Sequence, residues 1–206
     1  MKSVLVDLND AAATLPNSYN SVENITPLET PLSSTINGAA LATPVFLSLY
    51  AENDLRLDKY FAETDEKGFR KNKKAGSNNY LCTFRVGEIY LTAAEAAARL
   101  GELSQARTRL LELMRKRYAP EAYEAKSVVV NAMDKEALVQ EILDERAREL
   151  AFEGHRFFDM RRFNLPIYKP MIDKTLDIND HHRIQPIPLS EMQGNPVIAK
   201  QQNSGY

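Results

Sequence analysis

The feature that most constrains the fold is an alanine- and leucine-rich segment, residues 88–100, which stops at Gly101. Its apolar side chains recur with the spacing of one face of an α-helix. They are Ile89, Ala93, Ala96, Ala97 and Leu100. Glycine readily adopts the left-handed conformation that ends a helix, so Gly101 predicts the C-terminus of this segment.

A second helix is predicted directly after this turn, with Ser104 as its N-terminal cap. Its apolar stripe consists of Ala106, Leu110, Leu113 and Met114. The two segments predict a helical hairpin, and the small residue Ala94 stands where two helices of a tetratricopeptide-type (TPR) repeat approach closely. One such repeat cannot bury its own faces, so we expect it to stack on another element.

The hairpin also carries apolar residues away from its stripe, at Leu91 and Leu103. Exposed apolar patches commonly drive association. We therefore expect the chain to self-associate, or to cover the hairpin with its own residues 1–50.

A long amphipathic helix is predicted after Asp134, which is a good N-terminal cap. Its buried face consists of Leu138, Ile142, Leu143, Leu150 and Ala151. The pattern continues to about Phe163, and Gly154 is its weak point.

The flanking regions have a different texture. Residues 1–80 are irregular and loop-rich, with two apolar pieces at 45–50 and 55–61 that favour short helices. The basic run at 70–74 predicts an exposed loop. Residues 164–206 are punctuated by prolines and predict an extended C-terminal wrap over the helices, with one helical turn at 190–193.

We therefore predict a single all-α domain over residues 1–206, with its helical core at 84–163. The predicted fold is a TPR-like helical hairpin plus a long amphipathic helix, between irregular N-terminal and C-terminal segments.

Composition excludes several classes of protein. The 206 residues carry a net charge of -2, whereas a dedicated nucleic-acid binder usually has a basic surplus. The single cysteine, Cys82, excludes an internal disulfide framework and a cysteine-rich zinc site. Asp7 and Asp10 interrupt any apolar export signal, so the chain as written is expected to be soluble. Phosphate-loop and dinucleotide motifs are missing from the sequence, and no cofactor is predicted.

The richest cluster of chemical groups lies at the end of the long helix. Glu145, Glu149 and Glu153 are spaced by four, so they share a face and need cations nearby. The cations expected to supply this charge are Arg146, Arg156 and Arg162, with Asp159 three residues from each of the last two. Arg85 and Glu88 open the hairpin and could join the same network.

Two interpretations of this cluster stay open. One is an acid/base or metal site. The other is a partly buried ion-pair network that joins the helix to the hairpin and tail. The sequence contains neither a Glu-x-x-His pair nor a His-Glu-x-x-His motif, which favours the ion-pair network and predicts no metal.

Several of these motifs together resemble the SusD/RagB family. The first is Arg85-Val86-Gly87-Glu88-Ile89-Tyr90-Leu91, and the second runs from Glu145 to Arg162. The ending from Gln185 to Tyr206 and the Asp54-Leu55-Arg56 element are also similar to the family pattern.

This resemblance implies a non-catalytic, helical, TPR-containing protein. Family members are outer-membrane lipoproteins that capture glycans or other nutrients and sit as a lid on a TonB-dependent (SusC-like) transporter. The N-terminal half of the family fold, its signal peptide and its lipid-bearing cysteine are not found here. The resemblance therefore implies the C-terminal part of a longer precursor, or an unusually short relative.

The resemblance gives the signature residues around Glu149 a scaffold role and places ligand contacts partly in loops before the last repeat. The local candidates are Asn17, Tyr19, Asn20 and Asn37, and an ordinary polar loop is the alternative for each. The chain contains no tryptophan, which weakens the case for a complete glycan platform. Two other functions stay open: a TPR-like protein-interaction module, and a hydrolase that uses the Glu/Arg helix.

Overall fold

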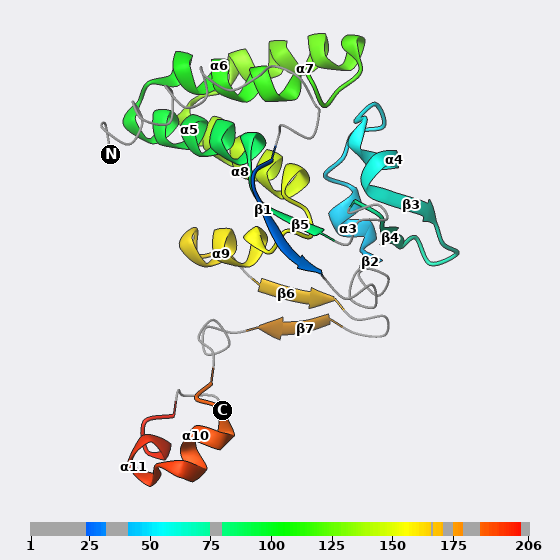
Figure 1. Cartoon of the computed structure of the whole chain (residues 1–206). Helices are drawn as coiled ribbons and strands as arrows, with labels where there is room; N and C mark the ends of the chain where they lie inside the picture. Colours follow the sequence, from blue (N-terminus) through cyan, green and yellow to red (C-terminus); the bar gives the residue numbers. More distant parts are fainter. Residues whose placement is uncertain are drawn as a thin grey trace. The chain divides into compact units, whose positions relative to one another are not determined.

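The computed structural model describes residues 24–31, 41–74, 80–165, 167–170, 175–178 and 186–202 (Figure 1). The chain divides into two compact units, Met1–Arg156 and Phe157–Tyr206, and each is described by itself. The single domain expected over the whole chain stays a prediction.

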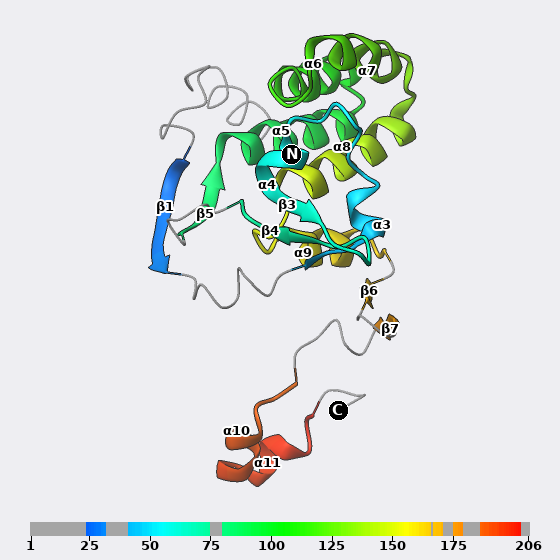
Figure 2. The same cartoon turned by 90° about the vertical axis from the view of Figure 1, so that its right-hand side faces the viewer.

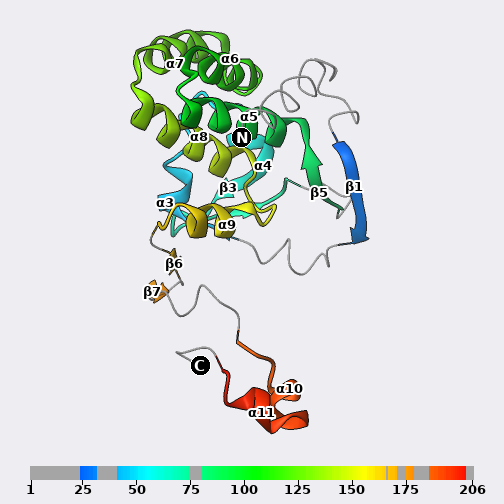
Figure 3. The ribbon, with the colours of Figure 1, turned by 90° about the vertical axis from the view of Figure 1, so that its left-hand side faces the viewer.

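Helices build most of the first unit, as predicted. They are α5 (Val86–Leu100), α6 (Leu103–Met114), α7 (Pro120–Ala132) and α8 (Lys135–Glu149). Helices α6 and α8 both pack against α5, and α7 packs against α6 (Figures 1 and 3). The predicted hairpin is therefore α5 and α6, and α8 is the element on which it stacks. Helix α7, which begins at Pro120, was not predicted from the sequence.

Local signals located two helix ends correctly. Gly101 has a φ of 86°, and its N–H donates to the carbonyls of Ala97 and Ala98. Asp134 caps α8, because its Oδ1 accepts the N–H of Ala137 at 2.8 Å. The prediction for Ser104 was wrong, since α6 begins one residue earlier, at Leu103.

The hairpin is buried on more than one side. Leu91 is fully buried in the same cluster as Leu138 and Ile142 of α8, and Leu103 is partly buried against that cluster. Leu91 and Leu103 are therefore not left exposed, because α5, α6 and α8 pack together around them. The prediction of self-association rested on an uncovered apolar surface of the hairpin, and this packing removes that argument.

Residues before α5 form short helices and two small antiparallel sheets. β1 (Asn24–Pro31) pairs with β5 (Tyr80–Arg85), and the other sheet has the order β2 (Leu41–Ala42), β4 (Arg70–Asn72), β3 (Phe61–Thr64) (Figure 2). The short helices are α3 (Pro44–Leu47) and α4 (Arg56–Tyr60). They confirm the two predicted helical pieces.

The basic run at 70–74 is not the exposed loop that was predicted. Its first three residues are the central strand β4, and only 12% of the Lys74 side chain is exposed. This sheet packs in an aromatic cluster that stabilises it. Phe61 of β3 contacts Phe46 and Tyr50 edge to face, and the ring centroids of the three residues lie 5.3–6.4 Å apart.

The long helix predicted to reach Phe163 is interrupted. Helix α8 ends at Glu149, and α9 (His155–Arg162) begins after a turn. Within that turn Phe152 has a φ of 62° and Gly154 a φ of 85°, which are left-handed conformations incompatible with a continuous helix.

The second unit contains β6 (Ile167–Pro170) paired antiparallel with β7 (Thr175–Ile178), then α10 (Leu189–Gly194) and α11 (Pro196–Ala199). This tail is thus more regular than the extended segment predicted for residues 164–206. No helix in the described ranges is long and apolar enough to cross a membrane.

Candidate functional site

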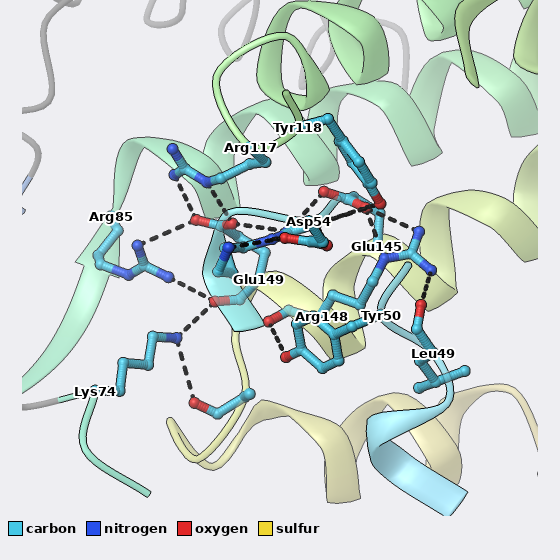
Figure 4. A network of polar contacts seen from close by, with 12 residues as sticks. Leu49, Tyr50, Asp54, Lys74, Arg85, Arg117, Tyr118, Glu145, Arg148 and Glu149 are labelled. Atoms are coloured by element: carbon cyan, nitrogen blue, oxygen red, sulfur yellow. Dashed lines mark hydrogen bonds and ion pairs between the residues drawn. The ribbon is translucent and has the colours of Figure 1, made fainter. Parts of the chain in front are cut away.

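The predicted Glu/Arg cluster lies where the end of α8 meets three other segments of the first unit. Backbone hydrogen bonds join two of them: Leu55 N donates to Arg117 O at 2.9 Å, and Ala119 N donates to Asn53 O at 3.1 Å. This pairing brings Arg56 and Arg117 beside α8. The third segment is the β5–α5 junction, which brings Arg85 (Figure 4).

Glu149 is the centre of this cluster and is completely buried. Arg117 donates to both of its carboxylate oxygens, at 2.7 Å from Nε and 2.6 Å from Nη2. Arg85 and Arg56 each donate a further hydrogen bond, at 3.2 and 3.1 Å. Glu149 therefore interacts with guanidinium groups from three separate parts of the chain.

Arg56 extends the cluster to a second buried carboxylate one helical turn earlier. It contacts Glu145 at 2.7 Å and Asp54 at 2.7 Å, and its side chain is 2% exposed. The rings of Tyr50 and Tyr118 also lie against this guanidinium, with centroids 5.9 and 5.5 Å from its central carbon. Arg56 is thus held by charge and by aromatic faces together.

Arg148 connects α8 to the segment before α4. Its Nη1 donates to the carbonyl of Leu49 at 3.1 Å, while its Nη2 contacts Glu141 at 2.6 Å. In return the Tyr50 hydroxyl donates to the carbonyl of Arg148 at 2.7 Å. This exchange fixes the 48–50 segment against the last turn of α8.

The carbonyl groups at the end of α8 are bound by side chains from distant segments. Arg85 Nη2 and Lys74 Nζ both donate to Glu149 O, at 2.8 and 2.6 Å. The last carbonyls of a helix lack partners within the helix and carry partial negative charge. Cations placed there stabilise the chain at the point where α8 stops.

The charges in this cluster are fixed. Burial alone would raise the pKa of Glu149, but Arg117, Arg85 and Arg56 outweigh it and hold the pKa well below its usual range. Burial would likewise raise the pKa of Glu145, and Arg56 and Arg148 lower it instead. A general acid or base must exchange a proton near the working pH. Carboxylates that stay ionised near neutral pH, held between guanidinium groups, are suited to a scaffold and not to acid/base chemistry.

The structure brings only some of the predicted residues into this cluster. Glu145, Glu149 and Arg85 lie in it, and Glu153 joins through Arg85 at 2.9 Å. Glu88 lies at the edge, with its Oε1 3.7 Å from His155 Nδ1.

Other predicted partners lie elsewhere. Arg146 donates to Thr92 Oγ1 at 3.3 Å, and Arg162 pairs with Asp159 at 2.8 Å within the second unit. Among the described residues, no carboxylate is paired with Arg156, so the partnership expected for Arg156 was wrong.

Besides Arg85, four cations of the cluster were not among the partners predicted for Glu145 and Glu149. They are Arg56, Lys74, Arg117 and Arg148. Within the described ranges, no three carboxylate, histidine or cysteine side chains form a group that could hold a metal ion. The ligand-contact candidates Asn17, Tyr19, Asn20 and Asn37 lie outside the described residues.

Comparison with known proteins gives a consistent family. A profile of the SusD family matches residues 40–206. The SusD-like protein P25 of Formosa agariphila is 31% identical over 133 residues, which cover 60% of this chain and 24% of P25.

Solved structures agree with this match. A candidate sugar binding protein of Bacteroides vulgatus is 27% identical with a TM-score of 0.61, over 80% of this chain and 39% of its own. A SusD superfamily protein of the same species is 27% identical with a TM-score of 0.55, over 75% of this chain and 36% of its own. The chain thus spans less than half the length of these relatives. With a family profile that matches most of the chain and solved relatives that share its fold, the chain belongs to the SusD family.

Proposed function

We propose that this protein is a surface-exposed nutrient-binding subunit that captures a glycan and passes it to a TonB-dependent (SusC-like) transporter. The observation that carries the proposal is the family match over residues 40–206, together with the fold shared with a candidate sugar binding protein. The proposed location is the outer membrane, where the protein acts as a lipoprotein on the cell surface.

The described residues contribute the scaffold in this proposal. The cluster around Glu149 ties α8 to the 53–56 segment, to the β5–α5 junction and to Arg117. Its charges are buried and paired with one another, so they cannot contact a glycan that binds from solution. We assign ligand contacts instead to the polar loop residues Asn17, Tyr19, Asn20 and Asn37, whose amide and aromatic groups suit sugar recognition.

The test is a glycan-array screen of the full-length protein, followed by calorimetry and product analysis on any glycan that binds. We expect saturable binding of an oligosaccharide that is recovered intact. Newly formed reducing ends would contradict the proposal and favour the hydrolase. Failure to bind any glycan, with stoichiometric binding of a peptide, would contradict it and favour a TPR-like interaction module.

A further inference from the structure

The turn after α8 contains a compact group of hydrogen-bond acceptors around one amine. Lys74 Nζ donates to Glu149 O at 2.6 Å, to Ala151 O at 3.2 Å and to Glu153 Oε1. A lysine ammonium has three N–H donors and no acceptor. Each donor therefore has an acceptor, and all three acceptors come from the five residues 149–153.

The surroundings complete a site for a cation. The face of the Tyr60 ring lies against the amine, with its centroid 4.3 Å from Lys74 Nζ. An aromatic face attracts an ammonium group, most strongly where water is excluded. Only 12% of the Lys74 side chain and 6% of the Glu153 side chain are exposed. The last carbonyl of α8, one carbonyl of the following turn, one carboxylate and one ring thus enclose a single amine.

From this geometry we infer that residues 149–153 and Tyr60 form a binding site for a primary ammonium group, which the chain fills with its own Lys74. Lys74 follows β4, whereas the acceptors lie at the end of α8 and in the turn after it. The site therefore joins two segments 75–79 residues apart at the turn where Phe152 and Gly154 redirect the chain.

Protonation at neutral pH is consistent with this assignment. Burial lowers the pKa of Lys74 to about 8, with Glu153 raising and Arg85 lowering it. The amine is thus mainly an ammonium ion at pH 7. Arg85 pairs with the same Glu153, so the carboxylate keeps a partner when Lys74 is removed.

The test replaces the tethered amine with an untethered one. Lys74→Ala removes three carbons and the amine, which is the size of n-propylammonium. We expect Lys74→Ala to lower the melting temperature of the 206-residue chain at pH 7 by about 3–8 °C. Millimolar n-propylammonium chloride should recover at least half of this loss. Tetramethylammonium chloride at the same concentration should not, because it has no N–H donor.

Two matched variants control for other effects. Lys73→Ala removes the exposed neighbouring lysine and should have the same melting temperature as the wild type. Lys74→Met keeps a long side chain without donors, so it should be destabilised and should not respond to n-propylammonium. Should Lys74→Ala fail to fold, the same salts are added during refolding, and recovery with n-propylammonium alone supports the site.

Three results would overturn the inference. The first is a Lys74→Met variant as stable as the wild type, which would mean that the ammonium contributes nothing. The second is no recovery of Lys74→Ala with n-propylammonium. The third is equal stabilisation of all variants by either salt, which would indicate a general effect of ionic strength.

Discussion

At Gly87, in the motif shared with the family, the charge cluster leaves no room for a larger residue. A Cβ atom added at Gly87 would lie 2.9 Å from Glu149 Oε1, 3.2 Å from its Cγ and 3.3 Å from its Cδ. The Glu149 carboxylate cannot move aside easily, because Arg117, Arg85 and Arg56 hold both oxygens. Glycine at this position therefore leaves room for the most heavily bonded carboxylate in the cluster.

We predict that Gly87→Ala destabilises the protein although alanine favours helices. Relief of glycine's helix penalty is worth about 1 kcal/mol, and overpacking of a rigid site costs about 1–3 kcal/mol. Because the added Cβ would also clash with Cγ and Cδ of Glu149, we expect a net decrease in the free energy of unfolding, measured by urea unfolding. Gly194→Ala in α10 is the control, since its added Cβ meets no atom within 4 Å. A stabilised Gly87→Ala variant would show that Glu149 is free to shift.

Tyr19 is the aromatic member of the proposed ligand loop. We predict that Tyr19→Ala weakens oligosaccharide binding by the full-length protein by about 1–3 kcal/mol, or roughly 5–150-fold, because one stacking ring with its hydroxyl is lost. We expect Tyr19→Ala to have the melting temperature of the wild type, because ligand contact and not folding is the role proposed for Tyr19. Calorimetry with the glycan identified by array measures the change, and an unaltered affinity removes Tyr19 from the site.

At the scale of elements, α8 depends on charge more than its apolar face suggests. Its last turn buries Glu145, Arg146, Ala147, Arg148 and Glu149. Fully buried carboxylates are tolerated only where cations and hydrogen bonds compensate for lost hydration. Helix α8 therefore holds its place partly through ionised groups, and this makes its stability dependent on pH.

We predict that the free energy of unfolding falls when the pH drops below about 4.5, the ordinary value for a glutamate. The pKa of Glu145 and of Glu149 is lowered in the folded state, so the unfolded chain binds protons first. Their contribution is complete above pH ~4.5 and is lost as the pH falls through the folded pKa. Urea unfolding at pH 7, 5, 4 and 3 measures the loss.

A matched comparison isolates the two buried groups. Glu149→Gln should be less stable at pH 7 and should lose less on acidification, whereas Glu121→Gln, at an exposed position on α7, should follow the wild type. Parallel acid profiles for all three proteins would contradict the assignment of this pH dependence to α8.

Local sequence signals predicted these elements well where the cause is local. The apolar stripes of α5 and α6, the left-handed Gly101 and the cap at Asp134 each involve neighbours within a turn or two. The end of α8 is different. Its apolar pattern continues past Glu149, and the helix stops where Lys74, Arg85 and Tyr50 bind its last carbonyls.

The cluster itself could be predicted only in part. Spacing by four placed Glu145 and Glu149 on one face, but the cations that bind Glu149 lie 32, 64 and 93 residues away. The spacing therefore favoured arginines nearer in sequence as partners of these glutamates, and for Arg156 this prediction was wrong. Arg56 lies in α4, Arg85 at the start of α5 and Arg117 in the segment after α6, and only the packing of these segments against α8 brings all three to Glu149.

At the scale of the whole molecule, the chain spans only part of the length of its relatives. It covers 24% of the P25 relative and 39% of the candidate sugar binding protein, yet α5, α6 and α8 share one continuous buried cluster. We propose that the charged end of α8 holds these helices together and takes no part in chemistry or binding.

The most direct test measures stability and binding together in Glu149→Gln. We expect the free energy of unfolding to fall by about 3–5 kcal/mol, because removal of one charge leaves buried guanidinium groups unpaired. Arg156→Ala is the control, because no carboxylate among the described residues pairs with Arg156, and it should change the free energy of unfolding by less than about 1 kcal/mol. Below the melting temperature, the folded Glu149→Gln protein in full-length form should bind its oligosaccharide with wild-type affinity. A variant with an unchanged melting temperature and lost binding would contradict the claim.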